Sequence, residues 1–199
     1  MQLSALIAAV RDEVQDPGAL RWSDATITRY LNDAQMDLAK DSKQLTIWTA
    51  SVASGATTIA APSDMLLPRY LWFEVGNSRV PIALRYGFPP EPATVTGDPI
   101  AMFVVGTYFY PYPVPGRAGT LYVGGVARPT TLSLSTDVPS IADADNLLID
   151  YAVLECLLSD GDPLAGPKQQ RYDRKRMEWL MLEAQKNPFP DQVDVRWEN

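Results

Sequence analysis

Hydrophobic residues recur at helical spacing at both ends of this chain and alternate with polar residues in its middle. In residues 2–14 the apolar positions fall every three or four residues, which predicts an amphipathic helix. The turn at residues 16–18 (Asp-Pro-Gly) ends it. A second helix is expected from Ser23 to about Lys40, with an apolar stripe of Ile27, Leu31, Ala34 and Leu38. The short connection predicts an antiparallel helical pair.

The second helix has a sharply defined beginning. Ser23 is a good N-cap, because its hydroxyl can accept from the free N–H groups of the first turn. Asp24 places negative charge at the positive end of the helix dipole. Trp22 can pack on Ile27 as a hydrophobic staple, whereas Thr26 stands where a full capping box would have Glu or Gln. We therefore expect a packing helix and no catalytic motif here.

The middle of the chain predicts a β-rich insertion at residues 43–138, built like a sandwich or a barrel from six to eight short strands. Residues 53–56 suit a hairpin turn, and Pro81 indicates an edge or a bulge. The proline-rich residues 86–99 predict an exposed loop. Strand-like runs occur at 45–49, 57–59, 70–75, 80–84, 100–105, 107–110 and 120–123.

Helices are expected again after the insertion. The run from about Asn146 to Leu158 is apolar on nearly every side and should be the most buried helix. A last helix should start near Pro167 and end near Lys186, with an inward face of Tyr172, Trp179, Leu180 and Leu182. The predicted fold class is α+β: a bundle of about four helices from residues 1–42 and 139–187, the insertion at 43–138, and an extended tail at 188–199.

The C-terminal tail has a strand-like alternation of large apolar and polar residues, carried by Phe189, Val193, Val195 and Trp197. Exposed side chains of this size gain nothing from water, so a free tail is not expected. Either the tail folds back on its own domain, or it docks on a neighbour by strand addition or by filling pockets. We favour the neighbour and treat these four residues as a candidate partner interface.

Charge and composition exclude several function classes. The chain has 199 residues and a net charge of −7, divided as −3 over residues 1–42, +2 over 43–128 and −6 over 129–199. Such an acidic chain is a poor candidate for gripping nucleic acid, which requires clustered Lys and Arg. One basic cluster stands out, and we interpret it as a solvated helix face before a partner contact: Lys168, Arg171, Arg174, Lys175 and Arg176. No uncharged run is long enough to cross a bilayer, and the apolar N-terminus predicts a helix instead of a signal peptide.

The reactive residue types needed for common enzymes are scarce. The chain contains no His, which excludes Ser-His and Cys-His nucleophiles and the common zinc sites, and its one Cys is expected to be buried. The acidic pairs Asp143/Asp145 and Asp160/Asp162 suit helix capping and turns better than catalysis or metal binding. No phosphate-binding loop, dinucleotide fingerprint or nucleophile elbow is present. We expect no enzymatic activity, no cofactor and no metal.

Short motifs stand at both ends of the chain. Those in the N-terminal part are Leu6-Ile7-x-x-Val10-Arg11, Asp16, Arg21-Trp22-Ser23-Asp24 and Tyr30-Leu31-Asn32-Asp33-Ala34-Gln35. Those near the C-terminus are Pro139-Ser140-Ile141, Leu148-Ile149-Asp150-Tyr151-Ala152-Val153 and Gln169-Gln170-Arg171-Tyr172. With these motifs the chain resembles the adaptor, or head-to-tail connector, proteins of tailed bacteriophages. The β-rich middle matches only in kind.

This resemblance implies a structural protein of the virion neck, made in the host cytoplasm. It implies a homo-oligomeric ring, dodecameric in the family, that binds the portal protein and presents a platform for nozzle or tail-completion proteins. DNA would pass through the ring without specific binding, which fits an excess of carboxylates. The polar face of the second helix becomes a candidate for subunit contact or channel lining: Arg29, Asn32, Asp33 and Asp37. The tail would grip the portal or a neighbouring subunit.

Two alternatives stay open at this level. The first is another tail or neck component, such as a tail terminator or tube protein. The second is a soluble carbohydrate- or protein-binding module whose β-rich part carries an aromatic face of Trp72, Tyr108, Tyr110, Tyr112 and Tyr122. The symmetry of an assembled ring would decide the first alternative, and sugar titration against a monomer would decide the second.

Overall fold

The structure is a computed structural model that describes residues 1–42, 44–90 and 95–186. It divides into two compact units, a helical unit of residues 1–42 and 128–186 and a β unit of residues 44–127. Within the described residues the prediction of an α+β fold with four helices and a β-rich insertion is confirmed. The predicted tail at residues 188–199 lies outside them.

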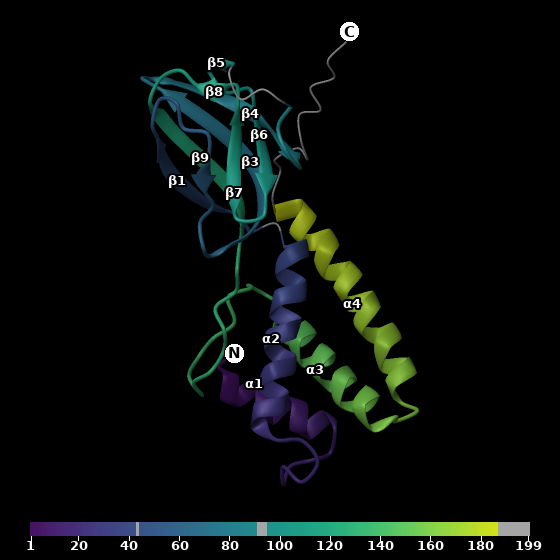
Figure 1. The fold of residues 1–199 in the computed structure, drawn as a ribbon. Coiled ribbons are helices and arrows are strands. Elements are labelled where there is room, and N and C mark those ends of the chain that lie inside the picture. The colour runs from purple at the N-terminus through teal and green to yellow at the C-terminus, as the bar shows by residue number, and fades with distance from the viewer. Residues whose placement is uncertain (43, 91–94, 187–199) are drawn as a thin grey trace. The chain divides into compact units, whose positions relative to one another are not determined.

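The helical unit is organised around its third helix. The helices are α1 (Leu3–Glu13), α2 (Asp24–Asp41), α3 (Asp145–Asp160) and α4 (Ala165–Lys186). Helix α3 packs against each of the other three (Figure 1). Nine of its 16 residues are buried, which confirms the prediction made from its apolar run. The helix ends at Gly161, whose φ of 67° is one that glycine adopts without strain.

The inward face of α4 is narrower than its sequence predicts. Tyr172 and Trp179 are buried and Leu180 is half-buried, as expected. Leu182 is 56% exposed, so the prediction that it faces inward is wrong. The buried residue on this turn is Glu183 instead. Spacing alone cannot fix the edge of a helix face, because the neighbouring elements decide where contact stops.

The segment that returns from the β unit belongs to the helical unit from residue 128 onward. The sequence pattern predicts instead that the β-rich insertion continues to residue 138. The backbone N–H groups of Leu3 and Ser4 donate to the carbonyls of Asp137 (2.8 Å) and Ser135 (3.1 Å). These bonds satisfy two of the free donors at the start of α1. The return segment therefore caps the first helix.

The β unit contains a strongly curved, nearly barrel-like sheet (Figure 1). In the described residues its seven strands run in the order β1-β9-β3-β4-β6-β7-β2, and β5 pairs with β8 in a separate two-stranded sheet. The strands are β1 (Thr46–Val52), β2 (Ile59–Ala60), β3 (Met65–Val75), β4 (Ser78–Tyr86), β5 (Thr96–Gly97), β6 (Ala101–Val105), β7 (Tyr108–Tyr112), β8 (Val114–Pro115) and β9 (Gly119–Ala127).

Two tight hairpins shape the sheet, whereas the hairpin turn predicted at residues 53–56 is wrong. Strands β3 and β4 form a hairpin closed at Gly76, and β6 and β7 form one about Gly106. Residues 53–56 do not close a hairpin, because β1 pairs with β9 and β2 pairs with β7. A local turn signal cannot show that each flanking strand has a more distant partner. Pro81 lies in the part of β4 that pairs only with β3, consistent with a local edge.

The inner faces of the main sheet enclose a single apolar core. Its buried members come from all seven strands of this sheet, in which inward and outward residues alternate. They are Val52, Ile59, Leu71, Phe73, Ile82, Met102, Phe109, Leu121 and Val123. Strand β9 approaches β3 closely where β3 is irregular, between Met65 and Leu67 and between Pro68 and Tyr70. Gly125 permits this approach, because a Cβ there would lie 2.3 Å from the Leu67 carbonyl oxygen.

Candidate functional site

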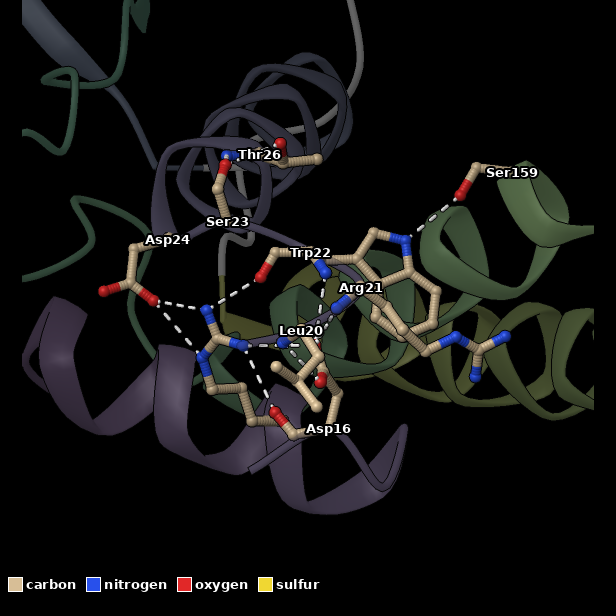
Figure 2. Close-up of polar contacts among 9 residues, drawn as sticks. Asp16, Leu20, Arg21, Trp22, Ser23, Asp24, Thr26 and Ser159 are labelled. Atoms are coloured by element: carbon tan, nitrogen blue, oxygen red, sulfur yellow. Dashed lines mark hydrogen bonds and ion pairs between the residues drawn. The ribbon is translucent and has the colours of Figure 1, made fainter. Parts of the chain in front are cut away.

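The connection between α1 and α2 is closed around one buried carboxylate. Asp16 is 4% exposed, and its side chain accepts hydrogen bonds from the backbone N–H groups of Leu20 (2.9 Å), Arg21 (3.1 Å) and Trp22 (3.1 Å) (Figure 2). Gln15 and Ala19 adopt positive φ angles of 56° and 53°. Non-glycine residues rarely hold this conformation unless their surroundings fix it. The three bonds to Asp16 supply that constraint.

Arg11 fills the centre of this connection. Its guanidinium donates to the Asp16 carboxylate (3.3 Å) and carbonyl (3.2 Å), and to the Trp22 carbonyl (2.9 Å). Two of its nitrogens also donate to Asp24 Oδ1, at 2.6 and 3.2 Å (Figure 2). The side chain is 7% exposed, so these partners compensate for the loss of water around a buried cation. We call Arg11, Asp16, Trp22 and Asp24 the clamp.

The clamp keeps Asp16 ionised. Burial raises the pKa of this carboxyl, but the backbone N–H donors of Trp22, Leu20 and Arg21, together with the Arg11 charge, outweigh burial and hold the pKa below its usual 3.8. A carboxylate that accepts several backbone hydrogen bonds is stabilised in its charged form. The Arg11–Asp16 pair is therefore charged at neutral pH.

The clamp also fastens the connection to the end of α3. The indole Nε1 of Trp22 donates to Ser159 Oγ at 3.3 Å, and the Ser159 hydroxyl donates to the Cys156 carbonyl at 2.7 Å. Arg21 forms an ion pair with Asp160. At the tip of the fastened connection Leu20 is 91% exposed, although its own N–H is bound by Asp16. The chain thus holds a large apolar side chain in water on a fixed backbone.

Helix α2 begins as predicted and then holds the return segment. The Ser23 hydroxyl accepts from the Thr26 N–H at 3.1 Å, so the N-cap prediction is confirmed. Farther along, the Asn32 side-chain amide both donates to the Leu132 carbonyl (3.0 Å) and accepts from the Leu132 N–H (2.8 Å). The buried Gln35 accepts from the Ser140 N–H at 3.0 Å. Asn32 and Gln35 therefore position the chain that returns from the β unit.

The candidate polar face of α2 is divided between internal and external residues. Asn32 makes the internal bonds just described, and Asp37 pairs with Arg176 of α4 at 3.1 Å. Arg29 and Asp33 are exposed, and the Arg29 guanidinium lies 5.0 Å from the Tyr30 ring centroid. Of the four residues, only Arg29 and Asp33 have the outward position that a subunit contact or a channel lining requires.

Most of the basic cluster on α4 is used within the helical unit. Lys168 pairs with Glu13 of α1, and Lys175 with the buried Asp150 of α3. Arg171 lies 3.5 Å from Asp150 and 3.9 Å from Glu13. Arg176 joins α4 to α2 through Asp37 and Asp41. The remaining member, Arg174, is exposed and forms no ion pair with the residues that the structure describes.

Ion pairs thus add to the apolar contacts that attach helix α4 to the bundle. Burial raises the pKa of Glu13, but its bond to Lys168 and the nearby cations lower it by more, so that the pKa falls below its usual 4.5. Two buried polar atoms on the inner face of α4, Tyr172 Oη and Trp179 Nε1, have no hydrogen-bond partner among the residues that the structure describes. Burial raises the pKa of Tyr172 to about 12.

The aromatic residues of the β unit lie in two groups. Tyr108, Tyr110 and Tyr112 alternate along β7 and share one face of it, with Phe88 packed edge-on against Tyr110 at 6.2 Å between ring centroids. Trp72 and Tyr122 are cross-strand partners on β3 and β9. The guanidinium of Arg79 lies 3.8 Å from the Tyr122 ring centroid and covers that ring. The five aromatics therefore do not form one open face.

The candidates for catalysis or metal binding that the structure describes, Cys156 and Asp162 among them, have structural roles. Cys156 is fully buried as predicted, and burial, aided by Asp160, raises its pKa to about 11. Asp162 accepts from the Leu164 N–H at 2.8 Å, which is the turn role expected of it. In the described part of the chain, no three His, Cys, Asp or Glu side chains are grouped to hold a metal ion. No helix among these residues is both long and apolar enough to span a membrane.

The tail candidates Phe189, Val193, Val195 and Trp197 lie outside the described residues. Sequence reasoning missed the clamp itself, although Arg11 and Asp16 were among the residues that carry the resemblance. An Arg at the inner face of a predicted amphipathic helix, followed five residues later by Asp in a turn, was the available signal. It indicates a buried charge pair, because an isolated Arg on an apolar face would be too costly to bury.

Comparison with known proteins gives one family. The family model described as SU10 adaptor protein matches residues 1–192 of the chain. No curated protein sequence matches the chain.

Proposed function

We propose, from the premise that this chain belongs to the SU10 adaptor protein family, that it forms the adaptor ring between the portal vertex and the tail of a bacteriophage. The family is one of phage adaptors, and the chain is accordingly a structural component of a virion. The position in the neck, the ring and the continuation of the DNA channel are our proposal. The observation that carries it is the match over residues 1–192, which includes the β unit and the helical segments on both sides of it.

The clamp supports an assembly role. The most specific motif residues, from Arg11 to Asp24, are occupied in fixing the backbone of one connection and in starting α2. A rigid connection that exposes Leu20 suits a contact surface, because its backbone is already ordered before a partner binds. We therefore expect an interaction role for this end of the helical unit and no catalytic step.

Charge supports passage of DNA through the assembled ring. The net charge is −7, and four of the five cations in the α4 cluster are paired with carboxylates of the same chain. A channel that lets DNA move should not hold its phosphates, and an excess of carboxylates repels them. We expect weak DNA affinity that is not specific for sequence.

The tail completes the proposal. Phe189, Val193, Val195 and Trp197 would form an assembly contact with the portal or a neighbouring subunit. Removing residues 188–199 should leave a folded protein that attaches to portal far less. Attachment equal to that of the full chain would exclude this role for the tail.

Electron microscopy of the purified protein mixed with portal from the same phage tests the main proposal. A closed ring at the portal face that continues the central channel is the expected result, and further density for tail proteins should appear on its far side. A ring with the symmetry of a tail tube, or binding only at the distal end of a tail, would support the terminator or tube alternative instead. A monomer that ignores portal and binds sugars through Tyr108, Tyr110 and Tyr112 would overturn the proposal.

A further inference from the structure

The outward side of α4 carries a line of exposed apolar residues that begins at a cation. Met177, Met181 and Leu182 are 56%, 59% and 56% exposed. Arg174 stands one turn before Met177 and forms no ion pair with the described residues, whereas the other four cations of its cluster pair with carboxylates of the bundle. Residues 174, 177 and 181 fall on one face of a helix, and Leu182 widens it.

A matching line with the opposite charge lies on the outward side of α1. Asp12, Ala8 and Ala5 are exposed and fall on one helix face. They are spaced by four and three residues, so they span the same seven residues of helix as positions 174, 177 and 181 on α4. Asp12 forms no ion pair with the residues that the structure describes. Each line is about 10 Å long, at 1.5 Å of rise per residue.

The two lines fit each other in only one direction. When Arg174 faces Asp12 in an antiparallel pair of helices, Met177 falls beside Ala8 and Met181 beside Ala5. Small side chains let two helices approach closely, and the unbranched Met side chain adapts its shape to fill the space over them. A parallel pair would place Arg174 beside Ala5 and would leave both charges unmatched.

The fit cannot be satisfied within one chain. Both lines are exposed in the same helical unit, in which α1 packs on α2 and α3 and turns its outer face to solvent. We propose that the line Arg174–Met177–Met181 of one copy docks antiparallel on the line Asp12–Ala8–Ala5 of a second copy. Two different surfaces meet, so the contact is heterologous, and it can repeat from copy to copy as a ring requires. This inference rests on the proposed ring and identifies its subunit contact.

Cysteine cross-linking tests the pairing in the full-length chain. The native Cys156 is fully buried, so thiols introduced at exposed positions are the reactive ones. A mixture of an Ala8→Cys chain with a Met177→Cys chain should give a disulfide-linked dimer, and neither chain alone should do so. A chain with both substitutions should give a ladder of higher oligomers. Cross-linking of the Met177→Cys chain with itself, or none in the mixture, would overturn the proposal.

Charge reversal tests the orientation. Asp12→Arg or Arg174→Asp should each reduce the cross-linked yield at least tenfold, and the two reversals combined in one chain should restore it. Both positions are exposed, so the melting temperature of each variant should equal that of the unreversed chain. A double reversal that stays as low as the single ones would exclude this pairing.

The outcomes separate the contact from the proposed function. Wild-type rings on the portal without Ala8–Met177 cross-links would overturn this contact and leave the adaptor role intact. Cross-linked oligomers that never bind portal would support the contact and count against the adaptor role. A chain that stays monomeric in concentrated solution and on the portal would overturn both.

Discussion

The guanidinium of Arg11 lies 3.3 Å from the carboxylate of Asp16, and both side chains are almost wholly buried. This pair joins α1 to the connection that follows it, and through Trp22 and Asp24 it sets where α2 begins. The N-terminal residues from Arg11 to Asp24, which carry part of the resemblance to phage adaptors, are therefore explained by backbone geometry. They fix one connection and the start of one helix.

Replacing Arg11 with Met should lower the free energy of unfolding by about 3 kcal/mol, because removal of one partner leaves a buried charge uncompensated. Urea unfolding followed by circular dichroism measures the change. Arg29→Met is the matched control, since Arg29 is an exposed cation on α2, and its effect should stay within about 0.5 kcal/mol. Equal effects of the two substitutions would show that the clamp adds no stability.

Stability should fall in acid as Asp16 and Glu13 become protonated. The folded state lowers the pKa of both groups, so their contribution is present above the unfolded values of 3.8 and 4.5 and is lost as pH falls through the lower folded values. Urea unfolding between pH 3 and pH 7 should show the loss at the acidic end. Asp16→Asn should flatten that part of the profile, because it removes one of the two carboxyls whose pKa is lowered. A profile unchanged by Asp16→Asn would contradict the prediction.

Tyr172→Phe should stabilise the protein by about 1 kcal/mol. The Tyr172 hydroxyl is buried and has no hydrogen-bond partner in the described ranges of the chain, and removal of an unsatisfied polar atom recovers its desolvation cost while the ring stays in place. Tyr151→Phe is the control, because Tyr151 packs against Tyr172 at 5.7 Å between ring centroids and is only half-buried. Thermal unfolding of both variants provides the comparison. A loss of stability in Tyr172→Phe would reveal a partner for the hydroxyl, such as a bound water.

Asp150→Asn should weaken the attachment of α4 and cost about 2–3 kcal/mol. The buried Asp150 is the shared partner of Lys175 and Arg171, so Lys175 would lose its anion and Arg171 would keep only the longer contact with Glu13. Asp33→Asn on the exposed side of α2 should change stability by less than about 0.5 kcal/mol. Amide hydrogen exchange should show the loss of protection concentrated in α4. Loss spread evenly over α1 and α2 would contradict a specific role in holding α4.

Gly125→Ala should destabilise the β unit by more than about 2 kcal/mol, because the new Cβ would collide with backbone atoms of β3 that cannot move aside easily. Gly166→Ala serves as the control. A Cβ at Gly166 meets nothing within 4 Å, and alanine in the first turn of α4 should be neutral or stabilising by up to about 1 kcal/mol. Tolerance of Ala at both positions would show that β3 shifts freely against β9.

Local sequence signals were sufficient to predict the helices and strands, but they could not show which elements and side chains pair in space. Ser23 marks the start of α2 because an N-cap acts within one turn. Residues 53–56 suggested a hairpin because turn chemistry is equally local, yet β1 pairs with a strand about 70 residues away. The α4 cations looked like a solvated face because sequence spacing does not show which carboxylates other helices bring to them.

The sequence by itself determined the α+β class, the four helices, most of the strands and the buried state of α3, because periodicity and caps act over a few residues. It also carried the family resemblance in residues from Arg11 to Gln35. Only the tertiary structure decided what those residues do. Arg11 is buried beside Asp16, and Asn32 forms hydrogen bonds with Leu132. Four of the five α4 cations form ion pairs within the bundle, whereas Arg174 is exposed. The reason is physical: charge pairing and strand pairing depend on distances in space, and residues far apart in the chain meet only after the whole chain has folded.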